Sequence, residues 1–106
     1  MSTDVRKLFD RIGALIEAPE DATPPPLAEI ERTLTDGYAQ AHVLEGERRR
    51  LDRKIATLAA SDGDAKAKAA ELSKLSTRAR RSGEELSRLR ELLAALRRHH
   101  AALRAA

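Results

Sequence analysis

The residues best suited to chemistry in this chain are two dense runs of arginine and lysine. Residues 47–54 carry 5 basic and 2 acidic groups, and residues 74–81 carry 4 basic groups and no acidic one. Such side chains neutralise phosphate groups and release counterions without reading base sequence. We call this set the basic belt, and it is the predicted nucleic-acid-binding surface: Arg48, Arg49, Arg50, Arg53, Lys54, Lys74, Arg78, Arg80 and Arg81.

Two interpretations of the basic belt stay open. The chain has only two aromatic residues, Phe9 and Tyr38. A platform that stacks single-stranded bases is therefore disfavoured, and the backbone of a duplex or of structured RNA is the better ligand. The alternative is the solvated face of an ordinary coiled coil, whose long cationic stems cover an apolar seam. Charge is uneven in either case, because residues 1–64 sum to −4 and residues 65–106 to +7.

The sequence gives little support for a metal site or for catalysis. His99 and His100 are adjacent, so on a helix they point about 100° apart and are poorly placed to hold one metal ion. His42 has no carboxylate or histidine four residues further on. No Ser or Lys nucleophile has a recognisable general base near it in the sequence. The chain also has no cysteine and no glycine-rich phosphate loop. We therefore predict no enzyme, no metal site and no cofactor.

A heptad pattern must position these residues. Apolar residues recur three and four apart for more than four heptads on each of two arms, which is typical of a coiled-coil seam. The first arm, predicted over residues 26–62, has Leu27, Ile30, Leu34, Gly37, Ala41, Leu44, Arg48, Leu51, Ile55 and Leu58 on this seam. The second arm, predicted from residue 64 onward, has Leu72, Leu75, Ala79, Ser82, Leu86, Leu89, Leu93, Leu96, His100 and Leu103.

The strongest turn signal between the arms is the segment 61–64, Ser-Asp-Gly-Asp. Gly63 can adopt a positive φ after a helix, and Asp64 can cap the next helix. With 42% apolar residues, 35% charged residues and so few aromatic ones, the chain is predicted to be all-α. We expect residues 27–106 to form a long antiparallel helical hairpin, which brings the two halves of the basic belt side by side.

Small and polar residues on or near the seam carry the packing predictions. Gly37 leaves room for a large residue of the other arm, and two registers place it against Leu86 or Leu93. Arg48 either specifies the register or extends to solvent. Gly46 and Gly83 lie off the seam, where local fraying is the simplest interpretation. Acidic groups near the start of the first arm are expected to face basic groups of the second: Glu29, Glu31 and Asp36 against Arg88, Arg90, Arg97, Arg98 and Arg104.

Residues 1–18 are predicted to contain a short amphipathic helix, at 4–18, and residues 19–26 a proline-rich linker. The apolar face of this helix is expected to pack on the open end of the hairpin, giving a three-helix base with a projecting two-helix arm. A partner protein or a membrane surface is the alternative destination. The predicted partner or oligomer interface comprises Val5, Leu8, Phe9, Ile12, Leu15, Ile16 and Leu92.

The functional expectation is a non-catalytic coiled-coil scaffold or adaptor that associates with itself or with a helix of a partner protein. Sequence-nonspecific nucleic-acid binding is the alternative, and peripheral membrane binding is a second one. The absence of cysteine and of a signal-peptide core predicts a soluble, cytoplasmic protein.

The order of elements, with an acidic and proline-containing break at residues 17–21, is architecturally similar to the start of phage-shock-protein-A-type membrane-remodelling proteins. The hairpin with its basic arm also resembles the tRNA-binding arm of seryl-tRNA synthetases and Rop-type RNA-binding hairpins. These likenesses rest on heptads and element order, so no family is assigned from them.

Overall fold

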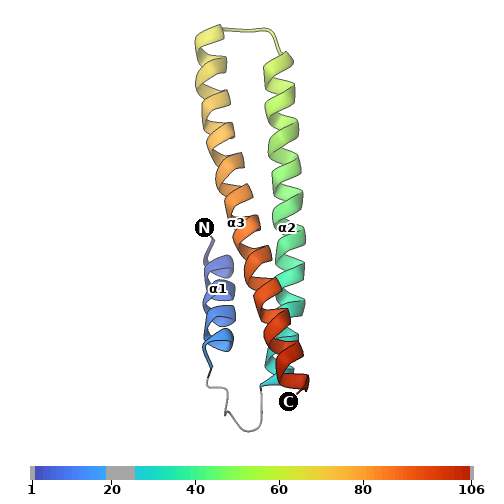
Figure 1. The fold of residues 1–106 in the computed structure, drawn as a ribbon. Coiled ribbons are helices and arrows are strands. Elements are labelled where there is room, and N and C mark those ends of the chain that lie inside the picture. The colour runs from blue at the N-terminus through green and yellow to red at the C-terminus, as the bar shows by residue number, and fades with distance from the viewer. Residues whose placement is uncertain (1, 19–25, 106) are drawn as a thin grey trace.

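The computed structural model describes residues 2–18 and 26–105 and confirms the predicted all-α hairpin (Figure 1). Its helices are α1 (Thr3–Ile16), α2 (Leu27–Ala60) and α3 (Ala65–Ala105). The molecule is a rod about 64 Å long and 16 Å across. Three helices form its base, and α2 and α3 alone form the projecting arm. The predicted proline-rich linker lies outside the described residues, apart from Pro26.

The seam between α2 and α3 holds the two long helices together. Each of the predicted seam positions except Arg48 is buried or half-buried. Side chains that recur every three and four residues lie on one face of each helix, so folding the chain back buries both faces at once. Burial is most complete in the base, where Leu89 and Leu96 are 0% exposed, and thins toward the tip, where Ile55 and Leu72 are half-buried.

The connection between the arms follows the predicted turn chemistry. Helix α2 ends at Ala60, and the Ser61 N–H and hydroxyl both donate to the Leu58 carbonyl, at 3.1 and 2.7 Å. Gly63 has φ +145°, which glycine adopts readily. The Asp64 side chain accepts from the backbone N–H of Ala67 at 3.0 Å, which caps the start of α3.

The structure selects one of the two registers left open by the sequence. A Cβ placed on Gly37 would lie 2.3 Å from Leu93 Cδ2, so the leucine of α3 packs directly onto the glycine backbone of α2. Both residues are buried. The absent side chain at Gly37 therefore makes the room that Leu93 occupies, and Leu86 is not its partner.

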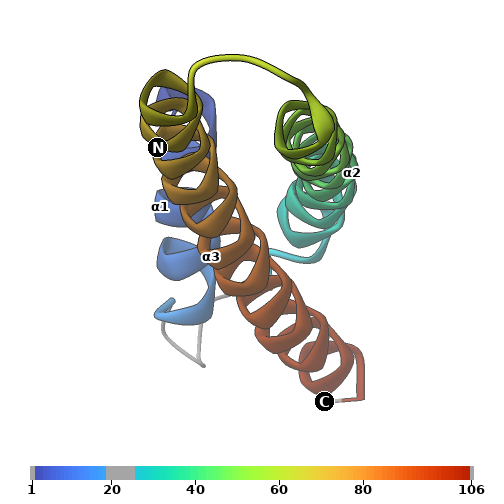
Figure 2. The same cartoon turned by 90° about the horizontal axis from the view of Figure 1, so that it is seen from above.

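Helix α1 packs on both long helices at the base, as predicted (Figures 1 and 2). It runs antiparallel to α2, with its N-terminal end directed toward the arm. Ser2 caps it by accepting from the Val5 N–H at 3.2 Å, and the helix ends at Ile16, two residues earlier than predicted. Val5, Leu8 and Ile12 are buried against the hairpin.

Candidate nucleic-acid interface

Some charged residues of the base are paired with one another, whereas others, such as Arg97 and Arg98, have no carboxylate partner among the described residues. Arg11 of α1 donates to Asp36 Oδ2 and to Thr33 Oγ1 of α2, each at 3.1 Å, and its guanidinium lies 3.8 Å from Glu29 Oε1. Thr33 is 0% exposed, and its hydroxyl also donates to the Glu29 carbonyl at 2.9 Å. The buried hydroxyl is therefore satisfied, and Arg11 ties α1 to α2.

The acidic residues at the start of α2 have different partners from those predicted. Glu29 and Asp36 pair with Arg11 of α1 rather than with arginines of α3, since α1 occupies the space beside them. Glu29 also pairs with Arg32 at 2.8 Å. Glu31 does face α3, but its partner is His100, at 3.1 Å.

Only one of the arginines expected to face these acids has a carboxylate partner among the described residues. This arginine is Arg90, and it pairs with Glu45. None of the predicted acid–arginine pairs is therefore present among the described residues, and the two arms are linked at the base by Arg90–Glu45 and Glu31–His100 instead.

The basic belt concentrates cationic side chains on the arm. All nine of its residues are exposed. Across residues 2–18 and 26–105, only Arg80 of the belt has an acidic partner, Glu84, which lies one turn away at 3.2 Å. The basic belt therefore presents eight cationic side chains that have no ion pair within the described residues, and an isolated surface pair such as Arg80–Glu84 adds little stability.

Six of the nine belt residues line two hollows of the hairpin, and Arg49, Arg53 and Lys74 line neither of them. The first has a volume of about 470 Å³ and runs between α2 and α3. We call it the cationic groove, and it is lined by Glu47, Arg50, Leu51, Lys54, Arg78, Arg81, Ser82 and Glu85. A second hollow, of about 510 Å³, is lined by Arg48, Ala79, Arg80, Gly83, Glu84, Ser87, Arg88 and Glu91. The two share no lining residue.

The Arg48 guanidinium lies beside Gly83, which sequence reasoning left to fraying. Both Gly46 and Gly83 lie within unbroken helix, so the expectation of local fraying is wrong. The Arg48 guanidinium leaves the seam, and its Nη1 lies 3.2 Å from the position that a Gly83 Cβ would take. Arg48 is exposed, so it extends along the surface of α3 toward solvent, one of its two predicted roles.

The predicted interface residues lie inside the base. Val5, Leu8 and Ile12 are buried, while four others are half-buried against the same core: Phe9, Leu15, Ile16 and Leu92. Binding of a partner or a membrane through these side chains would require α1 to leave the hairpin. The larger exposed apolar side chains among the described residues are instead Tyr38 and Val43, at 44% and 49%.

A further hollow beside Tyr38 was not predicted. It has a volume of about 420 Å³ and is formed by α2 and α3 without α1. Its lining comprises Tyr38, Ala41, His42, Glu45, Arg90, Leu93, Ala94 and Arg97. The exposed flank of the heptad pattern, where Tyr38 and Glu45 are one heptad apart, is the signal that could have located it.

Within the described ranges there is no group of three or more His, Asp or Glu side chains close enough to share a metal ion. None of the described helices has the length and apolarity needed to cross a membrane. Comparisons with protein-family models, with curated proteins and with solved structures find no match to this chain.

Proposed function

We propose that this protein is a non-catalytic binding module whose arm binds the phosphate backbone of duplex nucleic acid. The observation that carries the proposal is the concentration of exposed cationic side chains on the arm. All nine residues of the basic belt are exposed, and only Arg80 has a carboxylate partner among the described residues. Unpaired cations on a rigid support favour a polyanionic ligand over internal charge compensation.

The shape and composition of the arm agree with backbone recognition. A straight two-helix rod can lie along a duplex, and it lacks the aromatic side chains that single-stranded ligands need. Phosphate contacts fix position without reading sequence. The proposal therefore includes low sequence discrimination and a cytoplasmic location, where such ligands occur.

The test is binding of a short random-sequence duplex, measured by fluorescence anisotropy over a range of salt concentrations. We expect log K to fall linearly with log salt, by about 0.9 for each DNA phosphate contacted. A charge-reversal variant of the belt, with five arginines replaced by glutamate, should lose binding and keep its helical circular dichroism. Its substitutions are Arg49→Glu, Arg50→Glu, Arg53→Glu, Arg80→Glu and Arg81→Glu.

A matched control reverses five exposed cations of the base, which changes the net charge equally. Its substitutions are Arg6→Glu, Lys7→Glu, Arg97→Glu, Arg98→Glu and Arg104→Glu, all at exposed positions. This control should still bind the duplex, though more weakly, because general repulsion acts on both variants. Equal loss of binding by the two variants, or no binding by the unsubstituted protein, contradicts the proposal.

A second candidate function, docking of a helix from a partner or from a second copy, is favoured by the hollow beside Tyr38. α1 fills one flank of the hairpin base, and this hollow on the α2–α3 surface is left uncovered. Tyr38, which is 44% exposed, adds apolar area to its lining. Apolar surface with a polar rim is typical of helix-docking sites.

For self-association we expect sedimentation equilibrium at micromolar concentration to give a dimer rather than a monomer of 11.7 kDa. Ala94→Arg should dissociate the dimer, because Ala94 lines the hollow and a long cation would fill it. Ala59→Arg, at an exposed position near the tip, is the control and should leave the mass unchanged. A monomer throughout removes self-association from consideration.

A further inference from the structure

The cationic groove is the continuation of the groove in which α1 docks. In α2, Thr33 is two heptads before Glu47, and Lys54 is one heptad after it, so the three residues lie on the same flank of the helix. In α3, Arg78 and Leu92 flank the seam one heptad either side of Glu85. Thr33 bonds to Arg11 of α1, and Leu92 packs on the core that α1 helps to form. The same side of the hairpin is thus filled in the base and open in the arm.

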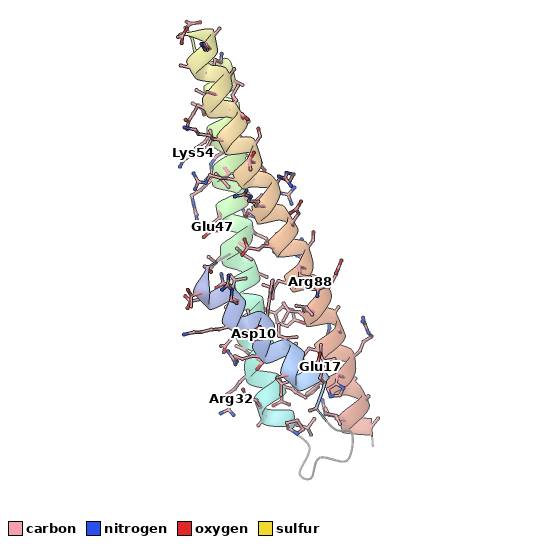
Figure 3. The ribbon with its side chains drawn as sticks, turned by 90° about the vertical axis from the view of Figure 1, so that its left-hand side faces the viewer. Asp10, Glu17, Arg32, Glu47, Lys54 and Arg88 are labelled. Atoms are coloured by element: carbon pink, nitrogen blue, oxygen red, sulfur yellow. The ribbon has the colours of Figure 1, made fainter. Side chains whose placement is uncertain are left out.

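The N-terminal end of helix α1 lies just below the open part of the groove. Arg11 lies at the level of Asp36, to which it is bonded. Thr3 lies eight residues earlier in an antiparallel helix, about 12 Å closer to the tip at 1.5 Å per residue. This is the level of Leu44, and the lining of the groove begins at Glu47. Figure 3 shows the N-terminal end of α1 below Glu47 and Lys54, in front of the two long helices.

The charge of the residues that line the cationic groove changes along its length. Glu47 and Glu85 lie at its basal end, next to α1, while cations from both helices line the distal part. Leu51 and Ser82 are its buried residues. Ser82 is 8% exposed, and in the described part of the chain its Oγ is the sole buried side-chain polar atom without a hydrogen-bond partner. A buried hydroxyl without a hydrogen-bond partner is unusual in a protein core.

We infer that this groove, and not the whole basic belt, seats one sugar–phosphate strand of the duplex; the inference rests on the proposed function. Arg50 and Lys54 approach from α2, and Arg78 and Arg81 from α3, so phosphate oxygens between them accept charge-assisted hydrogen bonds from both sides. Arg50 and Lys54 are about 6 Å apart along the helix axis. A B-form strand carries one phosphate per about 3.4 Å of its axis, so roughly two phosphates face this pair.

The two carboxylates give the ligand a direction. Glu47 and Glu85 repel phosphate at the basal end, and α1 closes the groove beyond them. The strand therefore leaves the groove toward the hairpin tip, where Arg53 and Lys54 line a further hollow with Thr57 and Leu58. Cations of the second hollow, such as Arg80 and Arg88, contribute only long-range attraction.

The experiment compares two triple variants of the full chain with the same net charge. The groove variant carries Arg50→Gln, Arg78→Gln and Arg81→Gln. The off-groove variant carries Arg49→Gln, Arg80→Gln and Arg88→Gln, at exposed positions outside the groove. With a random-sequence DNA duplex, the slope of log K against log salt should become shallower by about 2.7 in the groove variant, or about 0.9 for each lost contact. In the off-groove variant the change should stay below about 1.

Two single variants provide the same test if the triple variants fail to fold. Lys54→Gln should reduce the slope by about 0.9, whereas Lys66→Gln, at an exposed position near the tip, should leave it unchanged. Thermal melting confirms that each variant is folded. Equal slope changes in the groove and off-groove variants overturn the groove assignment and leave duplex binding by the belt intact. Absence of duplex binding by the unsubstituted chain overturns both proposals.

Discussion

Deletion of residues 1–18 should lower the free energy of unfolding of the hairpin by about 5 kcal/mol. Three side chains of α1 are buried on α2 and α3, namely Val5, Leu8 and Ile12. Each contributes about 1.5–3 kcal/mol of apolar burial, less the entropy of ordering the helix. The deletion also removes the Arg11 bonds and uncovers the apolar flank around Leu92. Urea unfolding followed by circular dichroism at 222 nm measures the change.

A point substitution separates docking of α1 from other effects of truncation. Ile12 is 0% exposed, and Ile12→Ala should reduce the free energy of unfolding by about 2–5 kcal/mol. Lys7→Ala, at an exposed position of the same helix, should change it by less than about 0.5 kcal/mol. If the truncated chain and Ile12→Ala both unfold at the same urea concentration as the full chain, α1 is not a structural part of the base.

The hairpin itself followed from the sequence because its determinants are local and repeated. Two runs of heptads fix which face of each helix is buried, and Gly63 with Asp64 fixes where the chain reverses. The choice between two registers did not follow, since shifting the arms by one heptad keeps apolar residues opposite one another. Packing of Leu93 on Gly37 resolves that choice only when both helices are placed in three dimensions.

The flank on which α1 docks was not predictable, and the errors in charge pairing follow from it. Small or apolar residues widen the seam on both sides, with Leu92 on one flank and Tyr38 on the other. Once α1 occupies the Leu92 side, Arg11 becomes the nearest cation to Asp36, which sequence reasoning had assigned to α3. The partner of a surface charge depends on this third helix and not on the heptads alone.

The candidate interface was predicted as a set of residues but not as a shape. Exposure of the belt follows from its position off the seam, except at Arg48, a seam residue whose guanidinium extends to solvent. The hollow that a belt residue lines depends on which flank of its helix that residue borders, and Arg50 and Arg80 lie on different ones. Heptad positions carry this signal, because residues seven apart share a flank. Assigning the cations to the two hollows from these positions also requires the antiparallel register of α2 and α3, which is known only from the structure.

Gly37→Ala should destabilise the protein by about 1–3 kcal/mol, although the same exchange in an exposed helix usually stabilises by about 1 kcal/mol. The new Cβ would lie 2.3 Å from Leu93 Cδ2, and Leu93 is 1% exposed, so its side chain has little space in which to move. Gly46→Ala is the matched control in the same helix. The nearest atom to its Cβ is Arg50 Nη1 at 3.5 Å, an ordinary contact, so this variant should be more stable by about 1 kcal/mol.

A double-variant cycle then tests the register directly. Leu93→Ala removes the atoms that collide with the new methyl group, so Gly37→Ala should be much less harmful in that background than in the unsubstituted protein. Leu86→Ala is the comparison, because the alternative register would place Leu86 opposite Gly37. In the register seen here the effects of Gly37→Ala and Leu86→Ala should add, to within about 0.5 kcal/mol. If the effect of Gly37→Ala is instead coupled to that of Leu86→Ala and adds to that of Leu93→Ala, the register seen here is wrong and the arms are shifted by one heptad. The cationic groove would then have different residues from α3 opposite Arg50 and Lys54.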